Sequence, residues 1–366
     1  MTKAAELAKM GEVLTSNQLS GRRNLLYNGN YQCWQRSTSE TGLGASSGYF
    51  TADRWHIGTS GSAGRFTMNR TAGDPTGFNY GLVINCTTAD TSIASGEFLL
   101  LQQKLEGQDL QHIKKGSSDA ETLTLSFHAK IVGSATDFVF ELNDADNSRL
   151  VSKKFTLTTD WVKYTYTFPA DTTGALDQDN ANSLTLKIWL HAGSDYTSGT
   201  LGETWASVTD ANRAVGIDSI YSSTSNEFYL AGVQLEVGSV ATPFEHRSFG
   251  EELKLCNRYY QEFNYDRHGY YVTNGGGNSS GQSTYLYTYY GGEMRATASI
   301  STPSVSNGYR FLGSNNDNTH STIPNIDNPS RLSVQFGNNQ NSISAGTTFR
   351  LFLAASGAKI KFDAEL

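Results

Sequence analysis

This chain of 366 residues has few cysteines, few prolines and no long apolar segment. Its three cysteines, Cys33, Cys86 and Cys256, are odd in number and far apart, which argues against a disulfide framework or a metal site. No apolar run reaches the length of a membrane span, and charges interrupt every early apolar window that a secretory signal would need. We therefore expect buried reduced thiols, synthesis in a reducing cytoplasm and no membrane insertion.

Positive charge is scarce as well. The sequence has 28 lysines and arginines against 35 acidic residues, whereas nucleic-acid binding needs clustered basic residues, so we expect no nucleic-acid partner. Aromatic residues make up 11% of the chain, which argues against disorder. Thirty-six glycines, with abundant Tyr, Thr and Ser, indicate turn-rich β structure. The length suits two domains or three short units.

Alternation of apolar and polar residues predicts half-buried antiparallel strands. In 183–191, aliphatic residues at every second position form a core stripe, and Lys187, Trp189 and His191 fall on the opposite face. Residues 121–130 and 136–142 have the same period. No helical segment lies between these strands, which favours an antiparallel sandwich of jelly-roll type over a parallel sheet.

The pattern divides the chain into four parts. Residues 1–23 are an attachment segment, in which 2–14 are predicted to be a short helix with Leu7, Met10 and Leu14 on one stripe. Such a helix is marginal alone, so it must pack on its own copies or on another protein, and a frayed tail is the alternative. Residues 24–247 form the sandwich, 248–264 a linking helix that opens with a capping box, and 265–366 a smaller β domain.

Five sequence blocks carry a family resemblance. They are Asn28-Gly29 with Trp34-Gln35-Arg36, Tyr49-Phe-Thr-Ala-Asp-Arg-Trp55, Pro243-Phe-Glu-His-Arg247, Cys256-Asn-Arg-Tyr-Tyr260 and Gly292-Glu-Met-Arg-Ala296. Together they span 24–296 and resemble bacteriophage tail-fibre and receptor-binding proteins, whose jelly rolls in turn resemble carbohydrate-binding modules. The resemblance implies a homotrimer in the virion, as a tail or head appendage. Its N-terminus would bind other virion proteins, and its C-terminus would face outward.

Within these blocks, Trp34, Asp53, Arg54 and Trp55 are a candidate structural motif. A charged pair beside a large ring can fix the first strands of a sandwich through bidentate hydrogen bonds, and a ligand site is the alternative. The segment 22–36 is expected to be an opening strand with a turn at Asn28-Gly29.

Related jelly rolls often hold a structural calcium between the opening turn and an acidic residue of the closing strand. In this chain Ala231 and Gly232 stand where those carboxylates would be. Asp144 and Asp146 have the alternate spacing of a calcium loop without its later Gly and Glu, so we expect a solvated hairpin tip there. No cofactor is expected.

Catalytic motifs are weak. The pattern Gly-x-Ser-x-Gly occurs at 44–48 and 277–281, but a nucleophile elbow needs a strand before it and a helix after it, and both matches lie in Gly/Ser loops. The seven histidines show no metal-ligand spacing, and no β-helix repeat is visible. We expect no enzymatic activity.

Aromatic surfaces remain, because the apolar faces of sugars stack on rings. One candidate is the face of Lys187, Trp189 and His191, with cover by a loop or a neighbouring chain as the alternative. The second candidate, which we favour, is a tyrosine ladder that comprises Tyr285, Tyr287 and Tyr289, with Tyr270 and Tyr271 upstream. The alternative interpretation is that these tyrosines form a contact between the subunits of a trimer.

The sequence therefore predicts a virion fibre subunit that binds a glycan or another receptor on the host cell surface during adsorption, without catalysis. The alternatives are a structural head-fibre, decoration or collar protein, and a polysaccharide depolymerase with a carboxylate pair in a cleft.

Overall fold

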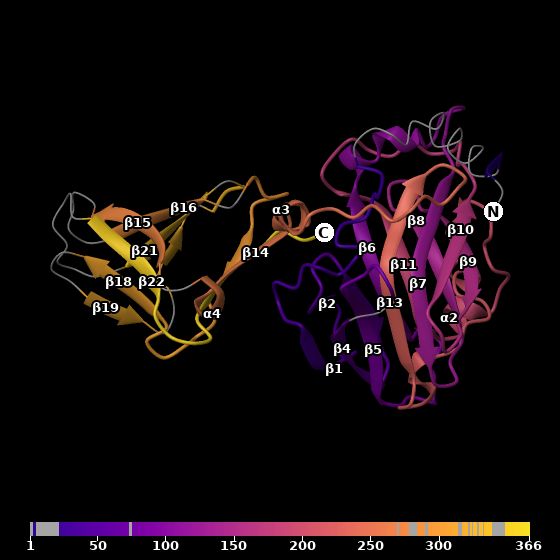
Figure 1. The fold of residues 1–366 in the computed structure, drawn as a ribbon, viewed down its shortest axis with the longest axis horizontal. Coiled ribbons are helices and arrows are strands. Elements are labelled where there is room, and N and C mark those ends of the chain that lie inside the picture. Colours follow the sequence, from indigo (N-terminus) through magenta and orange to yellow (C-terminus); the bar gives the residue numbers. More distant parts are fainter. Residues whose placement is uncertain are drawn as a thin grey trace. The chain divides into compact units, whose positions relative to one another are not determined.

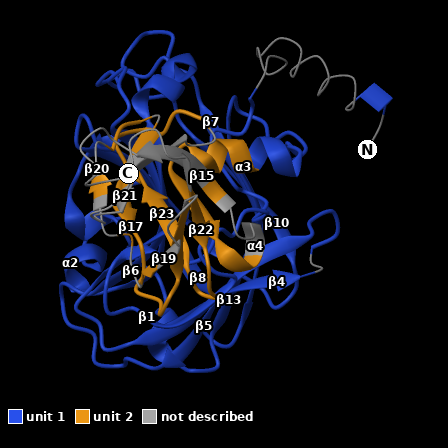
Figure 2. Cartoon of the chain, turned by 90° about the vertical axis from the view of Figure 1, so that its left-hand side faces the viewer, with its two compact units in different colours: residues 1–252, 366 blue, residues 253–365 orange. Residues whose placement is uncertain are grey.

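The computed structural model describes residues 3–4, 22–72, 75–268, 271–277, 284–289, 292–313, 317–320, 323, 325–327, 329–331, 333–338 and 348–366 (Figure 1). The expected stripe of Leu7, Met10 and Leu14 lies outside these residues. The chain divides into two compact units, Met1–Glu252 with Leu366, and Leu253–Glu365 (Figure 2). No helix in the described ranges is long and apolar enough to cross a bilayer.

The first unit is a sandwich of two antiparallel sheets, as the alternation predicts. In the described residues, one sheet has six strands in the order β1 (Ser39–Leu43), β4 (Arg65–Ala72), β5 (Tyr80–Thr88), β13 (Glu227–Val237), β7 (Leu123–Val132) and β10 (Val162–Phe168). The other has the order β12 (Ala206–Ser207), β9 (Arg149–Thr156), β8 (Asp137–Asp144), β11 (Asn182–Ala192), β6 (Phe98–Glu106), β3 (His56–Ser60) and β2 (Gly48–Tyr49). The predicted fold class, an antiparallel jelly-roll sandwich, is confirmed.

Aromatic side chains join the inner faces of the two sheets. The ring centroids of Phe127 on β7 and Phe140 on β8 are 4.5 Å apart, and Phe140 lies 4.5 Å from Phe155 on β9. Phe228 on β13 meets Phe138 on β8 at 5.4 Å. Because side chains alternate along a strand, these contacts identify the inward positions on β7 and β13 and leave the intervening residues on the outside.

In the residues that the structure describes, the second unit is also built mainly of antiparallel strands. Helix α3 (Phe249–Asn257) precedes a sheet in the order β14 (Tyr260–Asn264), β23 (Lys359–Asp363) and β17 (Ser299–Ser301). Helix α4 (Tyr265–His268) follows β14. The described part of the other sheet has the order β19 (Asp317–His320), β18 (Tyr309–Gly313), β22 (Thr348–Leu353), β15 (Tyr271–Gly277), β16 (Thr284–Tyr289), β21 (Ser333–Asn338) and β20 (Asn325–Asp327).

The helix expected at 248–264 is shorter than predicted. The capping box is present, because the Ser248 backbone N–H donates to Glu251 Oε2 at 2.9 Å and the Glu251 N–H donates to Ser248 Oγ at 3.3 Å. The helix ends at Asn257, and Tyr260–Asn264 pair with Lys359–Asp363 as β14. A strand partner about a hundred residues away overrides the local helical pattern, and no local signal reports it.

Candidate functional site

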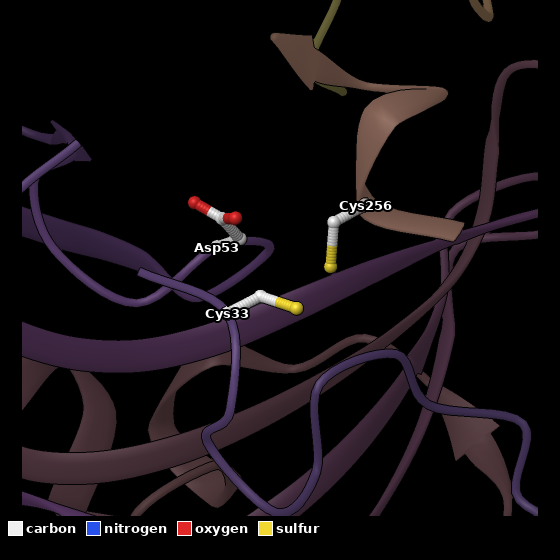
Figure 3. Close-up of side chains that lie close together, drawn as sticks. All are labelled: Cys33, Asp53 and Cys256. Atoms are coloured by element: carbon white, nitrogen blue, oxygen red, sulfur yellow. The ribbon is translucent and has the colours of Figure 1, made fainter. Parts of the chain in front are cut away.

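The opening segment is irregular where a strand was expected. Asn28 and Tyr31 have φ of 53° and 54°, in the left-handed region, so the backbone cannot continue as a strand. The Asn28 side chain closes the loop, because its Nδ2 donates to the carbonyl oxygens of Cys33 (2.8 Å) and Asp53 (3.0 Å) and its Oδ1 accepts from the Cys33 N–H (2.9 Å). Figure 3 shows the side chains of Cys33 and Asp53 in this part of the first unit.

All four residues of the predicted structural motif, Trp34, Asp53, Arg54 and Trp55, are buried. Trp55 Nε1 donates to the carbonyl oxygen of Asn28 at 3.1 Å, and Arg54 donates to that of Lys104 on β6 at 2.7 Å. The ion pair of Asp53 is with Arg36, at 3.6 Å. These contacts tie the opening loop to the seven-stranded sheet and favour a structural role over a ligand site.

The expected face of Lys187, Trp189 and His191 is not an open surface, which corrects its assignment as a candidate contact. Lys187 and Trp189 do point away from the core, but Trp189 is only 1% exposed. A register shift between Trp189 and His191 breaks the alternation, so His191 lies opposite the core residue Leu99 and is fully buried. Trp189 packs against Tyr196 (ring centroids 5.1 Å apart), its indole N–H donates to Glu141 at 3.2 Å, and Lys187 lies 3.3 Å from the same carboxylate. Residues 193–217 therefore cover this sheet, and alternation along one strand cannot reveal such a cover.

For the tyrosine ladder, the structure describes the strands but not the side chains. Strand β16 contains Tyr285, Tyr287 and Tyr289 and pairs with β15, which begins at Tyr271. The side chains of these residues, and all of Tyr270, lie outside the described part of the structure.

The six-stranded sheet, by contrast, turns a mixed polar and aromatic face away from the core, here called the outer face. Since Phe228 points inward, its neighbours Glu227 and Tyr229 point outward. The register places Tyr229 between Val83 on β5 and Lys130 on β7, and Glu227 between Asn85 and Val132. On the next rung Ala231 lies opposite His128, which pairs with Lys163 on β10. The polar alternation of 121–130 thus belongs to this face.

Two rings and a lysine form the centre of the outer face. Trp161, just before β10, meets Tyr229 edge-on, with ring centroids 6.1 Å apart and an interplanar angle of 77°. The Lys130 ammonium lies 4.7 Å from the Tyr229 centroid and 5.4 Å from that of Trp161. All three side chains are partly exposed. The face thus offers ring surface and a charged donor side by side.

The Tyr229 hydroxyl is held as a hydrogen-bond donor. It donates to Glu227 Oε2 at 2.6 Å. Burial, with a smaller effect from the Glu227 carboxylate, raises the pKa of Tyr229 to about 12. The phenol therefore remains protonated, and one Glu227 oxygen stays engaged with it.

Unsatisfied polar atoms flank the rings. In the described residues, Asn85 Oδ1, His128 Nδ1 and Trp161 Nε1 are shielded from water and have no hydrogen-bond partner. Leaving such an atom unpaired costs about 1–3 kcal/mol, so it marks places where waters, ions or ligands bind. Burial, and then the charge of Lys163, lower the pKa of His128, which keeps this ring neutral at pH 7.

An aromatic cluster closes one end of the outer face. Gly232 on β13 has φ of 59°, and a Cβ there would lie 2.3 Å from the ring of Phe78. Phe78 also packs against His128 and His246, at centroid distances of 5.1 and 5.4 Å. Only a glycine admits Phe78 here, and on β13 the residues from Leu230 to Glu236 are buried.

Two of the oxygens between the opening turn and the closing strand, where related jelly rolls hold calcium, are engaged with protein donors. The Asn28 carbonyl accepts from Trp55, and Glu236 accepts from the Thr242 backbone at 2.9 Å and its hydroxyl at 2.6 Å. Asn30 Oδ1, also at the turn, is buried without a hydrogen-bond partner among the described residues.

The loop of Asp144 also differs from the expected solvated tip, because the Asp144 carboxylate is buried against an internal cation. Lys115 Nζ lies 2.5 Å from Asp144 Oδ2 and 3.0 Å from Asp171 Oδ2. It also donates to the carbonyl oxygens of Thr173 and Gly174, both at 2.9 Å. The ammonium of Lys115 thus has the oxygen surroundings that a bound cation would have.

No protein-family model matches the chain, and no curated protein matches it. Similar solved structures include the enzymatically active domain of tailspike protein 4 of bacteriophage CBA120, with TM-score 0.31 and 10% identity over 58% of this chain and 21% of that one. A CBM4 module is similar with TM-score 0.31 and 13% identity, over 57% of this chain and 97% of that one. TmCBM61 in complex with β-1,4-galactotriose is similar with TM-score 0.31 and 8% identity, over 59% of this chain and 99% of that one.

Proposed function

We propose that this chain is a subunit of a bacteriophage virion fibre that binds a glycan on the host cell surface without catalysis. The virion role rests on the five sequence blocks that resemble tail-fibre and receptor-binding proteins. The glycan contact is assigned to the outer face around Trp161, Tyr229 and Lys130 instead of the tyrosine ladder, whose side chains the structure does not describe.

The observation that carries the glycan proposal is the pairing of two partly exposed rings with partly exposed polar side chains. Trp161 and Tyr229 offer surfaces on which the C–H face of a sugar can stack. The partly exposed side chains of Lys130 and Asn85 offer a charged donor and an amide group to sugar hydroxyls. A face of this kind binds each sugar weakly, and three copies in a trimeric fibre would raise the avidity.

The test compares a variant that lacks one ring of the outer face with a variant that lacks an aromatic ring elsewhere in the chain. Changing Trp161 to Ala should weaken adsorption of the protein to host cells about tenfold. An aromatic stacking contact contributes about 0.5–1.5 kcal/mol beyond the area that it buries, and about 1.4 kcal/mol corresponds to a tenfold change in affinity. Changing Phe249, which is 56% exposed on α3, to Ala is the matched control and should leave adsorption unchanged.

Both variants should keep the wild-type circular dichroism spectrum and oligomeric state. Unchanged adsorption of the folded Trp161→Ala protein would contradict the assignment of the outer face. If the wild-type protein itself never adsorbs to host cells, the structural alternative, a head-fibre, decoration or collar protein, becomes the better interpretation.

A further inference from the structure

We infer that the glycan bound by the outer face carries an acidic group, a carboxylate or a phosphate, which is held at the β7–β10 edge. The inference rests on the proposed glycan binding and adds the chemical class of the ligand. It starts from the charges on this face, where the lysines lie on β7 and β10 and the carboxylate of Glu227 lies on β13.

Lys130 is a half-buried cation that lies against two aromatic rings. Its ammonium lies over Tyr229 and Trp161, and among the described residues no carboxylate comes within ion-pair distance of it. Other shielded lysines of the same unit are paired: Lys115 lies 2.5 Å from Asp144, and Lys187 lies 3.3 Å from Glu141. A partly desolvated ammonium held between ring faces has a strong interaction to offer to an incoming anion.

The neighbouring groups extend the positive side of the face. Lys163 is exposed on edge strand β10, directly opposite His128, and so adds a second cation near the first. His128 is neutral at pH 7 and adds no charge.

The negative group of this face lies on β13 itself. Glu227 is opposite Asn85 and Val132, one rung from Lys130, and its carboxylate already accepts the Tyr229 hydroxyl at 2.6 Å. An acidic sugar would therefore place its anion toward Lys130 and Lys163, and its neutral hydroxyls toward Asn85. A neutral sugar would leave both ammonium groups without an anion.

The experiment compares acidic and neutral forms of the same sugar. Calorimetric titration of the full chain with trigalacturonate should give binding about tenfold tighter than with its methyl ester at low salt, because the ester keeps the ring faces and removes the charge. A trisaccharide with one phosphate, measured against its unphosphorylated parent, shows which acidic group is preferred. Raising the salt to about 0.5 M should weaken binding of the acidic forms alone.

Two variants locate the effect. Lys130→Met should remove most of the preference for acid over ester while the ester still binds, whereas Lys254→Met, an exposed lysine on α3, should preserve it. Equal binding of acidic and neutral forms would overturn the inference and leave the proposed glycan binding standing. If Lys130→Met still prefers the acidic form over the methyl ester, the acidic group binds elsewhere, and this result would also overturn the inference. If no form binds and Trp161→Ala adsorbs to cells like wild type, the inference and the proposed function both fail.

Discussion

Removing the internal ammonium of Lys115 should strongly destabilise the first unit. The Lys115 side chain is 3% exposed and that of Asp144 is fully buried, so Lys115→Met would leave the Asp144 carboxylate buried without its cation. Breaking a buried ion pair by removing one partner costs about 3–5 kcal/mol. Asn147 still donates to Asp144, and Arg149 to Asp171, so we expect about 3 kcal/mol.

Urea unfolding followed by tryptophan fluorescence measures this loss, which should lower the midpoint of the first unit by about 1–2 M. Lys114→Met is the matched control, because the neighbouring Lys114 side chain is 47% exposed in its ion pair with Glu121, and its midpoint should not move. Changing Asp144 to Asn in the Lys115→Met background should restore part of the stability, since it removes the uncompensated charge. Wild-type stability of Lys115→Met would refute the reasoning.

The same cluster predicts a pH dependence. Burial alone would raise the pKa of Asp171, but hydrogen bonds from Arg149 and Lys115 hold that pKa below its usual value of 3.8. A carboxyl group whose pKa is lowered by folding stabilises the protein above the unfolded pKa. This contribution should be lost as the pH falls below about 4, and Lys115→Met should show a shallower loss of stability in acid.

Four further predictions follow from the fold and the proposed function. Trp189→Ala should destabilise the first unit by about 3–5 kcal/mol in urea unfolding, because Trp189 is a buried anchor for residues 193–217. Gly232→Ala should cost more than about 1 kcal/mol in the same assay, since the left-handed backbone and the Phe78 ring both oppose a methyl group. Light scattering should give a homotrimer in solution, and a stable monomer would contradict the fibre proposal. Incubation with host polysaccharide should release no reducing ends, whereas release abolished by changing a single carboxylate would favour a depolymerase.

The inward positions of the sandwich could be predicted because one face of each strand is uniformly apolar. Leu184, Leu186 and Ile188 are buried as their alternation requires. Alternation does not indicate what covers the other face of a strand. The pattern therefore predicts Trp189 at an open surface, whereas residues 193–217 cover it in the structure. The polar side of 121–130 was recognisable, but its partners were not, because register with β13 and β10 joins residues far apart in sequence.

Trp161 gave no signal of its own, since it lies outside the periodic part of β10 and acquires its role only beside Tyr229 and Lys130. The buried cluster around Lys115 was hidden for a related reason. A lysine followed by glycine and serines, at 115–118, has the composition of a solvated turn. Only the approach of Asp144, at the end of β8, and of Asp171, in the segment after β10, converts this lysine into an interior residue.

The place of β13 in the six-stranded sheet has a consequence for synthesis on the ribosome. This strand lies between β5 and β7, yet Glu227–Val237 are translated after every other strand of that sheet. Until they emerge, the nascent chain has two unpaired strand edges in the middle of its future sheet. Closing the gap joins residues 95 to 114 positions apart on the β7 side and 142 to 148 positions apart on the β5 side, which makes the step slow. Chains arrested before Val237 should therefore bind chaperones or aggregate.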